Sequence, residues 1–423
     1  MTQHQSVGQG AVGRRKFLGA IATTGVVGAG GKIAAAAEAT RESTKDLLRS
    51  MKITRVRFYK APSRSMFNQS SHVCTVETDH GITGIGEGGS PDTISQTAAQ
   101  LIGEQPTRIE HLWQLMYRGY FYPPGREKIH AVGALDMALW DIKGKALGLP
   151  VYELLGGAVR NHVECYSTGF PGKGGLRDAA RRCMDAGFRA FRTSTTGSGN
   201  SFNTRHSVQD TYKNCLEIRA GVGPRGDWAI DYHTRLDMPD AIRLSTLIED
   251  LEPYFCEDLI RTENPGVYKQ LRQQVKVPIA VGEQFGDRWE INELMEQRLI
   301  DYSRVSLPNA GGITEFMKIA AIAETHYVGL VPHFTGPIAT AALVHACSAF
   351  PGPVMMEMTG DGFKQIAHLP VCYDFRNGKL WPNDRPGLGV ELDTSTLELV
   401  LEVTEHDAGA PLNRRPDGSI TNW

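Results

Sequence analysis

The feature that most constrains the fold is a regular alternation of β-rich and helical segments after residue 162. The β-rich segments lie at residues 163–166, 190–193, 228–230, 254–256, 278–281, 301–305, 328–331 and 354–356. Amphipathic helical spacing lies between several of them, at 177–186, 238–250 and 314–325. Strands separated by helices pair in parallel, and about eight such units in about 200 residues favour a closed (β/α)-type barrel. A doubly wound sheet fits less well, because the glycine-rich segment 171–175 lacks the G-x-G-x-x-G spacing.

The residues before the barrel have a different pattern. Two β-prone runs, 73–78 and 82–85, flank a turn at 79–81 and predict a hairpin in a small sheet. Apolar residues then recur at helical spacing over 93–115 and 131–147. The α/β chain of 423 residues therefore divides into an N-terminal α+β domain over 51–160 and a barrel over 161–370.

Composition points to a small-molecule ligand. The formal charge is −2 and no block of like charges occurs, so we expect no nucleic-acid partner. The seven cysteines are scattered singly, without metal-finger spacing, and are predicted to be small buried apolar side chains.

The first 37 residues have the parts of an export signal. Arg14 and Arg15 precede an apolar Gly/Ala-rich run that ends in small residues at 34–37. Paired arginines in this position are typical of the twin-arginine route, which predicts a periplasmic or otherwise extracytoplasmic protein. The apolar run is short for a transmembrane helix, so we expect no stable membrane insertion after processing.

Three acidic residues occupy equivalent places in the predicted barrel. Asp231, Glu257 and Glu283 each follow a β-rich segment, and they are spaced by 26 and 26 residues. Because functional groups of such barrels lie where strands end, we expect the three carboxylates to meet in one mouth. Their mutual repulsion calls for a cation, and hard oxygen ligands suit Mg²⁺. The sequence therefore predicts a magnesium site.

Several ordered motifs accompany these acids. They are ALDMALWDIKGK at 134–145, LLGG at 154–157, DYH at 231–233, ED at 257–258, GEQ at 282–284, GGIT at 311–314, PH at 332–333 and PGLG at 386–389. In these motifs, which span nearly all of residues 51–400, the chain resembles the mandelate racemase and muconate lactonizing branch of the enolase superfamily. The resemblance is strongest to its acid-sugar dehydratases of the galactonate dehydratase kind.

The resemblance implies a modified TIM barrel, (β/α)7β, with an α+β capping domain that the C-terminal segment 371–423 completes. It also implies a shared reaction, in which the proton α to a substrate carboxylate is removed and the metal stabilises the resulting enediolate. We expect a sugar acid as the substrate, dehydration to a 2-keto-3-deoxy acid as the reaction, and a homo-oligomer as the assembly.

The resemblance also assigns roles to three further residues. His333 matches the general base, His233 matches the acid that protonates the departing β-hydroxyl, and Glu357 matches an acid that hydrogen-bonds the substrate carboxylate. Racemases of the family carry a Lys-x-Lys pair where this chain has Arg192, and an arginine is too basic to accept the proton. A two-base racemase of the usual kind is therefore disfavoured.

One position departs from the family pattern. The family pairs the base histidine with an aspartate after the sixth barrel strand, and Ser306 stands there in this chain. A serine can orient an imidazole but cannot stabilise its cation as a carboxylate does. An epimerase, racemase or cycloisomerase that uses the same enediolate, and a sugar-acid binding protein without catalysis, stay open as alternatives.

Overall fold

A computed structural model describes residues 42–61, 72–119, 121–122, 124–197, 202–362, 366–409 and 412–421. The predicted export segment, 1–37, lies outside the described residues. None of the helices among the described residues is both long enough and apolar enough to cross a membrane. All seven cysteines are buried free thiols, as the sequence predicts.

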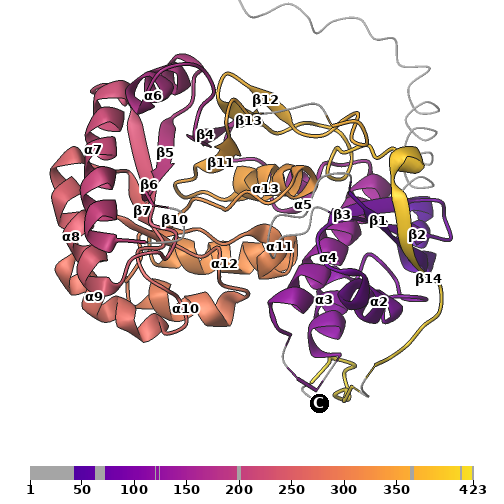
Figure 1. Cartoon of the computed structure of the whole chain (residues 1–423). Coiled ribbons are helices and arrows are strands. Elements are labelled where there is room, and N and C mark those ends of the chain that lie inside the picture. The colour runs from indigo at the N-terminus through magenta and orange to yellow at the C-terminus, as the bar shows by residue number, and fades with distance from the viewer. Residues whose placement is uncertain are drawn as a thin grey trace, which may run out of the picture. The chain divides into compact units, whose positions relative to one another are not determined.

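Eight parallel strands form the barrel predicted from the alternation (Figure 1). They are β4 (Val163–Thr168), β5 (Ala190–Ser194), β6 (Asp227–Asp231), β7 (Phe255–Glu257), β8 (Ile279–Val281), β9 (Tyr302–Ser303), β10 (Gly329–Leu330) and β11 (Met356–Thr359). Neighbours in the chain pair from β4 to β10, and β11 pairs with β4. An isolated parallel bridge between Leu330 and Val354 lies at the remaining junction, with a hydrogen bond from Met355 N to Leu330 O of 3.0 Å.

A helix follows each of the first seven barrel strands, and after β9 the short helix α11 (Leu307–Ala310) precedes it. These helices are α6 (Leu176–Asp185), α7 (Thr204–Val222), α8 (Met238–Ile248), α9 (Tyr268–Gln274), α10 (Arg288–Glu296), α12 (Ile313–Thr325) and α13 (Pro337–Ala349). The fold class predicted from the sequence, (β/α)7β, is thereby confirmed. Figure 1 shows α6 to α10 along the outer side of the strands. Inside the barrel, Tyr166, Phe255, Val331 and Met355 pack together and form an apolar floor below the strand ends.

Most of the other elements form an α+β capping region, which is the second layer of the fold. An antiparallel sheet has the order β14-β1-β2-β3, with bounds β14 (Glu398–Val403), β1 (Ile53–Lys60), β2 (Val73–Thr78) and β3 (Thr83–Glu87). The helices α2 (Pro91–Ala99), α3 (Ile109–Arg118) and α4 (Arg126–Leu147) accompany it. Because β14 pairs with β1, the chain returns from its C-terminal region to this capping sheet.

The C-terminal region also contacts the barrel. A short hairpin of β12 (Asp374–Arg376) and β13 (Lys379–Trp381) pairs antiparallel with β4. The short helix α5 (Val151–Leu154) lies between α4 and β4, and the short helix α11 (Leu307–Ala310) lies between β9 and α12. The domain boundaries near residues 160 and 370 stay a prediction.

The helical segment expected over 93–115 differs from the structure. Two helices, α2 and α3, replace it, with a break between residues 99 and 109. Gly103 adopts a left-handed φ of 83° in this break, and Pro106 cannot donate a backbone hydrogen bond. The apolar spacing continues across the break because both helices bury residues in one core, including Ile94 and Leu112.

Buried carboxylates join the capping layer to barrel helices. Asp136 of α4 accepts hydrogen bonds from the Thr314 backbone N at 3.0 Å and its Oγ1 at 2.5 Å, at the start of α12. Glu87 at the end of β3 accepts from Ala339 N at 2.8 Å, at the start of α13. A carboxyl oxygen at a helix N-terminus accepts hydrogen bonds from backbone amides that have no partner within the helix. These contacts hold the two layers together in one unit.

Candidate active site

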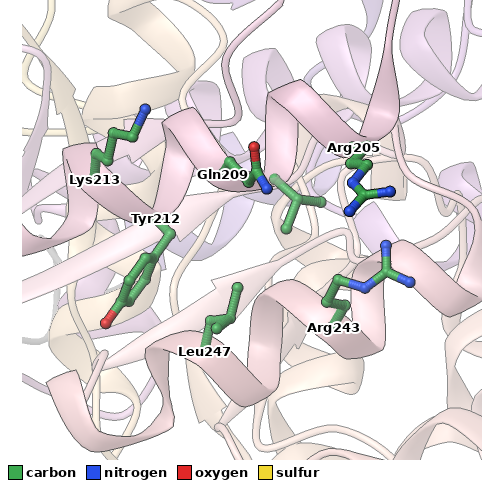
Figure 2. A pocket seen from close by; sticks show the side chains of 7 residues that line it. Arg205, Gln209, Tyr212, Lys213, Arg243 and Leu247 are labelled. Atoms are coloured by element: carbon green, nitrogen blue, oxygen red, sulfur yellow. The ribbon is translucent and has the colours of Figure 1, made fainter.

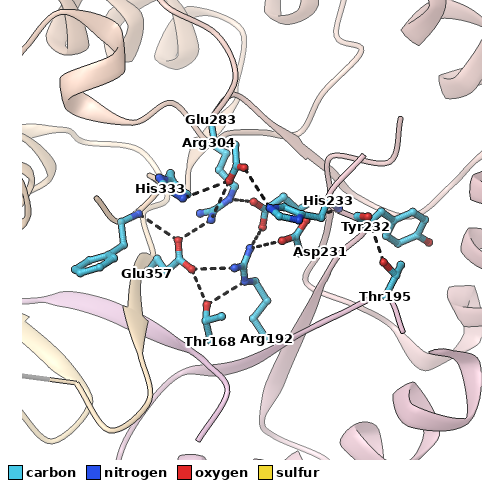
Figure 3. Close-up of polar contacts among 12 residues, drawn as sticks. Thr168, Arg192, Thr195, Asp231, Tyr232, His233, Glu283, Arg304, His333 and Glu357 are labelled. Atoms are coloured by element: carbon cyan, nitrogen blue, oxygen red, sulfur yellow. Dashed lines mark hydrogen bonds and ion pairs between the residues drawn. The ribbon is translucent and has the colours of Figure 1, made fainter. Parts of the chain in front are cut away.

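The carboxylates of Asp231, Glu257, Glu283 and Glu357 lie at the carboxyl ends of the barrel strands. Figure 3 labels Asp231, Glu283 and Glu357. Asp231 and Glu257 end β6 and β7 and are direct register partners across these strands. Glu283 follows β8, and Glu357 lies on β11. Parallel strands bring their ends to the same face of the barrel, so residues far apart in the sequence meet there. The predicted metal residues and the predicted acid Glu357 therefore lie around one mouth.

Two buried arginines lie among these carboxylates. Arg192 on β5 places Nη1 at 3.3 Å from Asp231 Oδ2 and Nη2 at 2.9 Å from Glu357 Oε1, and it also pairs with Glu257. Arg304 directly follows β9 and places Nη2 at 2.6 Å from Glu357 Oε2 and 3.6 Å from Glu283 Oε2. Its Nε also pairs with Glu257. The guanidinium of Arg304 is fully buried, so it is a fixed positive charge in the site.

The arginines divide the carboxylates into two kinds. Burial opposes ionisation of Glu257 and Glu357, but Arg192 and Arg304 outweigh it and lower the pKa of both. Burial and Glu257 raise the pKa of Asp231 to about 7. Burial, Glu257 and Asp258 raise the pKa of Glu283 to about 10. A bound cation would allow Asp231 and Glu283 to be ionised at the same time.

The donor set fits a divalent cation. Among the described residues, ligand oxygens of Glu257, Asp258 and Glu283 all lie within 4.8 Å of one another. Asp231 is not in this cluster. Its Oδ1 accepts from His233 N at 2.6 Å, and its Oδ2 forms an ion pair with Arg192 Nη1 at 3.3 Å. Carboxylate oxygens with no sulfur or imidazole nitrogen among them suit Mg²⁺.

The two predicted histidines contact the same carboxylate. His333 Nε2 lies 3.5 Å from Glu283 Oε2, and His233 Nε2 lies 4.0 Å from Glu283 Oε1. Figure 3 shows the two rings on either side of Glu283. Burial and Arg304 lower the pKa of His333 to about 4, and burial and Arg235 lower that of His233. Near neutral pH both rings are uncharged, which is the state of a base that is ready to accept a proton.

Glu357 is held on several sides. Its Oε1 accepts from Thr168 Oγ1 at 2.6 Å, and its Oε2 accepts from Phe334 N at 3.1 Å. Because the two arginines also contact it, Glu357 is ionised in this arrangement. The contact to Phe334 fixes the backbone next to His333, so Glu357 also orients the loop of the predicted base.

Ser306 is fully buried at the start of α11. Its Oγ makes no hydrogen bond to any of the residues that the structure describes. The carboxylate near His333 is Glu283 rather than an acid at position 306.

The sequence did not single out Arg304, Thr168 or Asp258 as site residues. All three end or follow barrel strands, which was the available signal. Their residue types alone did not separate them from residues elsewhere on the surface, because the role of a strand-end residue depends on which side chains lie next to it in the fold.

A separate surface pocket lies between α7 and α8 (Figure 2). It is lined by Arg205, Val208, Gln209, Tyr212, Lys213, Arg243 and Leu247. None of these lining residues is a carboxylate or a histidine, so this pocket has no group for acid–base chemistry near neutral pH or for a metal. The strand ends hold the chemistry instead.

Sequence comparison identifies the family. The family described as "Enolase C-terminal domain-like" matches residues 175–396, and "Mandelate racemase / muconate lactonizing enzyme, N-terminal domain" matches residues 49–156. The chain belongs to the mandelate racemase and muconate lactonizing branch of the enolase superfamily. The family predicted from the motifs is therefore confirmed.

Relatives in this branch narrow the reaction. The chain is 36% identical over 389 residues to a D-galactonate dehydratase of Xanthomonas oryzae pv. oryzae, covering 88% of this chain and 100% of that protein. It is 34% identical over 394 residues to a D-galactonate dehydratase of Pectobacterium atrosepticum, with the same coverage of both chains. D-galactonate dehydratases are hydro-lyases. Similarity to them over most of its length identifies this chain as an enzyme of the acid-sugar dehydratase type.

Solved structures agree with this assignment. A member of the enolase superfamily from Salmonella Typhimurium has a TM-score of 0.77 and 27% identity, covering 84% of this chain and 100% of that one. An enolase from Pantoea ananatis with bound D-gluconate and Mg has a TM-score of 0.72 and 28% identity, covering 81% and 93%. These enolase-superfamily structures share the capping domain and barrel.

The predicted location is corrected by the same comparison. Export by the twin-arginine route to the periplasm or another extracytoplasmic space is wrong, because the galactonate dehydratase relatives are cytoplasmic enzymes. The prediction rested on Arg14 and Arg15, which lie outside the described residues and before residue 49, where the family match begins.

Proposed function

We propose that this enzyme dehydrates a sugar acid to a 2-keto-3-deoxy acid, with His333 as base, His233 as acid and Mg²⁺ as cofactor. One observation carries the proposal: His233 and His333, which follow β6 and β10, approach the two oxygens of Glu283 from opposite sides (Figure 3). A substrate bound at this carboxylate cluster would have one imidazole on each face. Opposed faces suit removal of a proton from one carbon and loss of hydroxide from the next.

The dehydration requires two proton transfers. His333 Nε2 takes the proton from the carbon α to the substrate carboxylate, and the electron pair of that C–H bond moves toward the carboxylate. The pair then forms the Cα–Cβ double bond as the β C–O bond breaks, and His233 gives its proton to the leaving oxygen, which departs as water. The enol product becomes the keto acid by tautomerisation. His333 enters this sequence uncharged. His233 enters it protonated, a form that the negative charge of a bound substrate carboxylate favours.

The metal would be held by Asp231, Glu257 and Glu283. When bound, the cation neutralises negative charge that develops on the substrate carboxylate as the α-proton leaves. Arg192 and Arg304 keep Glu257 ionised, so this carboxylate is ready to act as a ligand without first losing a proton.

Arg192 supports dehydration over racemisation. Its guanidinium is engaged with Asp231, Glu257 and Glu357 and stays charged, so it cannot accept a proton where a racemase has lysine. The D-galactonate dehydratases and the gluconate-bound neighbour make six-carbon aldonic acids the first substrates to test. A homo-oligomer stays a prediction.

The test is incubation with a set of sugar acids in the presence and absence of Mg²⁺. We expect Mg²⁺-dependent keto-acid formation, and exchange of the α-proton for deuterium in deuterated solvent. Exchange without keto acid would instead indicate an epimerase, racemase or cycloisomerase. Binding without either reaction would indicate a sugar-acid binding protein.

A further inference from the structure

Asp258 is a buried carboxylate with no hydrogen-bond partner among the described residues. Its side chain is 0% exposed, and neither Oδ1 nor Oδ2 accepts a hydrogen bond from any described residue. Its backbone is fixed by hydrogen bonds from Asp258 N to Ala280 O at 3.1 Å and from Thr234 N to Asp258 O at 2.9 Å. Arg304 and Arg192 attract its negative charge but donate no hydrogen bond to it, and a buried carboxylate without a donor is strongly unfavourable. A group from outside the chain should therefore complete this position.

The local backbone brings Asp258 toward the metal cluster. Successive residues of a strand point to opposite faces, so Asp258 would normally point away from Glu257. The strand ends at Glu257, and Asp258 adopts a φ of 43°, which interrupts this alternation. A carboxylate oxygen of Asp258 consequently lies within 4.8 Å of ligand oxygens of Glu257 and Glu283.

The other carboxylates of the mouth already have partners in the protein. Both oxygens of Glu257 accept from arginines, and Asp231 accepts from His233 N and forms an ion pair with Arg192. Together with Asp258, Glu283 and Glu357, these groups are five carboxylates facing two guanidiniums, an excess of three negative charges when all are ionised. The oxygens of Asp258 are thus free to meet a cation or the water bound to it.

We infer that Asp258 supplies a fourth carboxylate to the divalent-cation site, in addition to Asp231, Glu257 and Glu283. The inference deepens the proposed function and rests on it, because it concerns the same cation. Replacing a carboxylate that contacts a metal or its bound water should lower metal affinity by at least about tenfold.

The test measures cation binding by calorimetry, with Mg²⁺ alone and with Mn²⁺ alone, on the full-length wild type, Asp258→Asn and Asp136→Asn. Asp136 is a matched control, because it is equally buried but accepts hydrogen bonds from Thr314. We expect Asp258→Asn to lose at least about tenfold in affinity and Asp136→Asn to bind as the wild type does. The melting temperature without cation should rise in Asp258→Asn, and the cation-induced increase in melting temperature should shrink.

Wild-type affinity in Asp258→Asn would overturn the inference and leave the proposed function untouched. A wild type that binds cation with Asp258-dependent affinity but forms no keto acid would overturn the proposed function and leave the inference standing. Absence of any divalent-cation binding by the wild type would overturn the inference. If Asp258→Asn does not fold, Asp258→Ala is measured against the same criteria.

Discussion

His333 and His233 lie 3.5 Å and 4.0 Å from Glu283, but their substitution should have different effects on catalysis. If His333 takes the α-proton, His333→Asn must lose both keto-acid formation and deuterium exchange, by at least about a hundredfold. If His233 only protonates the leaving oxygen, His233→Asn should lose dehydration but keep measurable exchange. Proton NMR in deuterated solvent follows exchange, and a keto-acid assay follows turnover.

The reverse pattern would exchange the two roles. Exchange that persists in His333→Asn but disappears in His233→Asn would make His233 the base. The distances of 3.5 Å and 4.0 Å to Glu283 place both rings within reach of a substrate there. The roles of base and acid are therefore assigned by comparing deuterium exchange and turnover in the two variants. His326→Asn, which changes a residue at the C-terminal end of α12, is the control and should leave both readouts unchanged.

Glu257 joins the arginines to the metal site, so its charge should be essential. Glu257→Gln leaves Arg192 and Arg304 facing one carboxylate fewer and removes a metal ligand. We expect kcat to fall by at least about a hundredfold and Mg²⁺ binding to weaken. Steady-state kinetics over a range of Mg²⁺ concentrations checks both effects. Glu252→Gln, an exposed change shortly before β7, should be neutral, and a fully active Glu257→Gln would exclude this metal site.

At the scale of single elements, the start of α12 depends on one side chain. Thr314 donates to Asp136 Oδ1 at 2.5 Å and accepts from Trp140 Nε1 at 2.9 Å. Gly312 just before it has no room for a side chain, because a Cβ there would lie 2.4 Å from Asp136 Oδ2. The junction between α4 and α12 is therefore close-packed and polar.

Thr314→Val should destabilise the protein by about 1–3 kcal/mol, because it leaves a buried carboxylate oxygen and the indole N–H without partners. Urea denaturation measures the free energy of unfolding. Thr325→Val is the matched control, since Thr325 is exposed at the other end of the same helix and should change this free energy by less than about 0.5 kcal/mol. Equal effects of both variants would contradict the role of Thr314.

At the scale of the whole molecule, Glu87 joins the capping sheet to helix α13, which follows the His333 loop. Burial raises the pKa of Glu87 from 4.5 to about 8. The folded protein then holds this proton more tightly than the unfolded chain does. Its contribution to stability is fully present below pH 4.5 and is lost as the pH rises through about 8. Asp136, whose pKa burial raises to about 7, contributes with the same sign.

We expect Glu87→Gln to reduce the fall in unfolding free energy between about pH 5 and about pH 8.5, because the amide carries no titrating proton and can still accept from Ala339 N. Denaturation curves at several pH values measure this slope. Glu127→Gln, at an exposed position in the first turn of α4, should leave the slope as in the wild type. An unchanged slope in Glu87→Gln would show that Glu87 does not titrate in this range.

The barrel and the strand-end positions of three acidic residues could be predicted from the sequence. Strand and helix periods are local, and Asp231, Glu257 and Glu283 recur at strand ends whatever their partners are. Tertiary structure decided the rest. Arg304 became a central counter-charge and Asp258 a buried carboxylate without a partner because burial and pairing depend on strands that are distant in the chain. These electrostatic properties arise from packing, which a residue's own neighbours in the sequence do not fix.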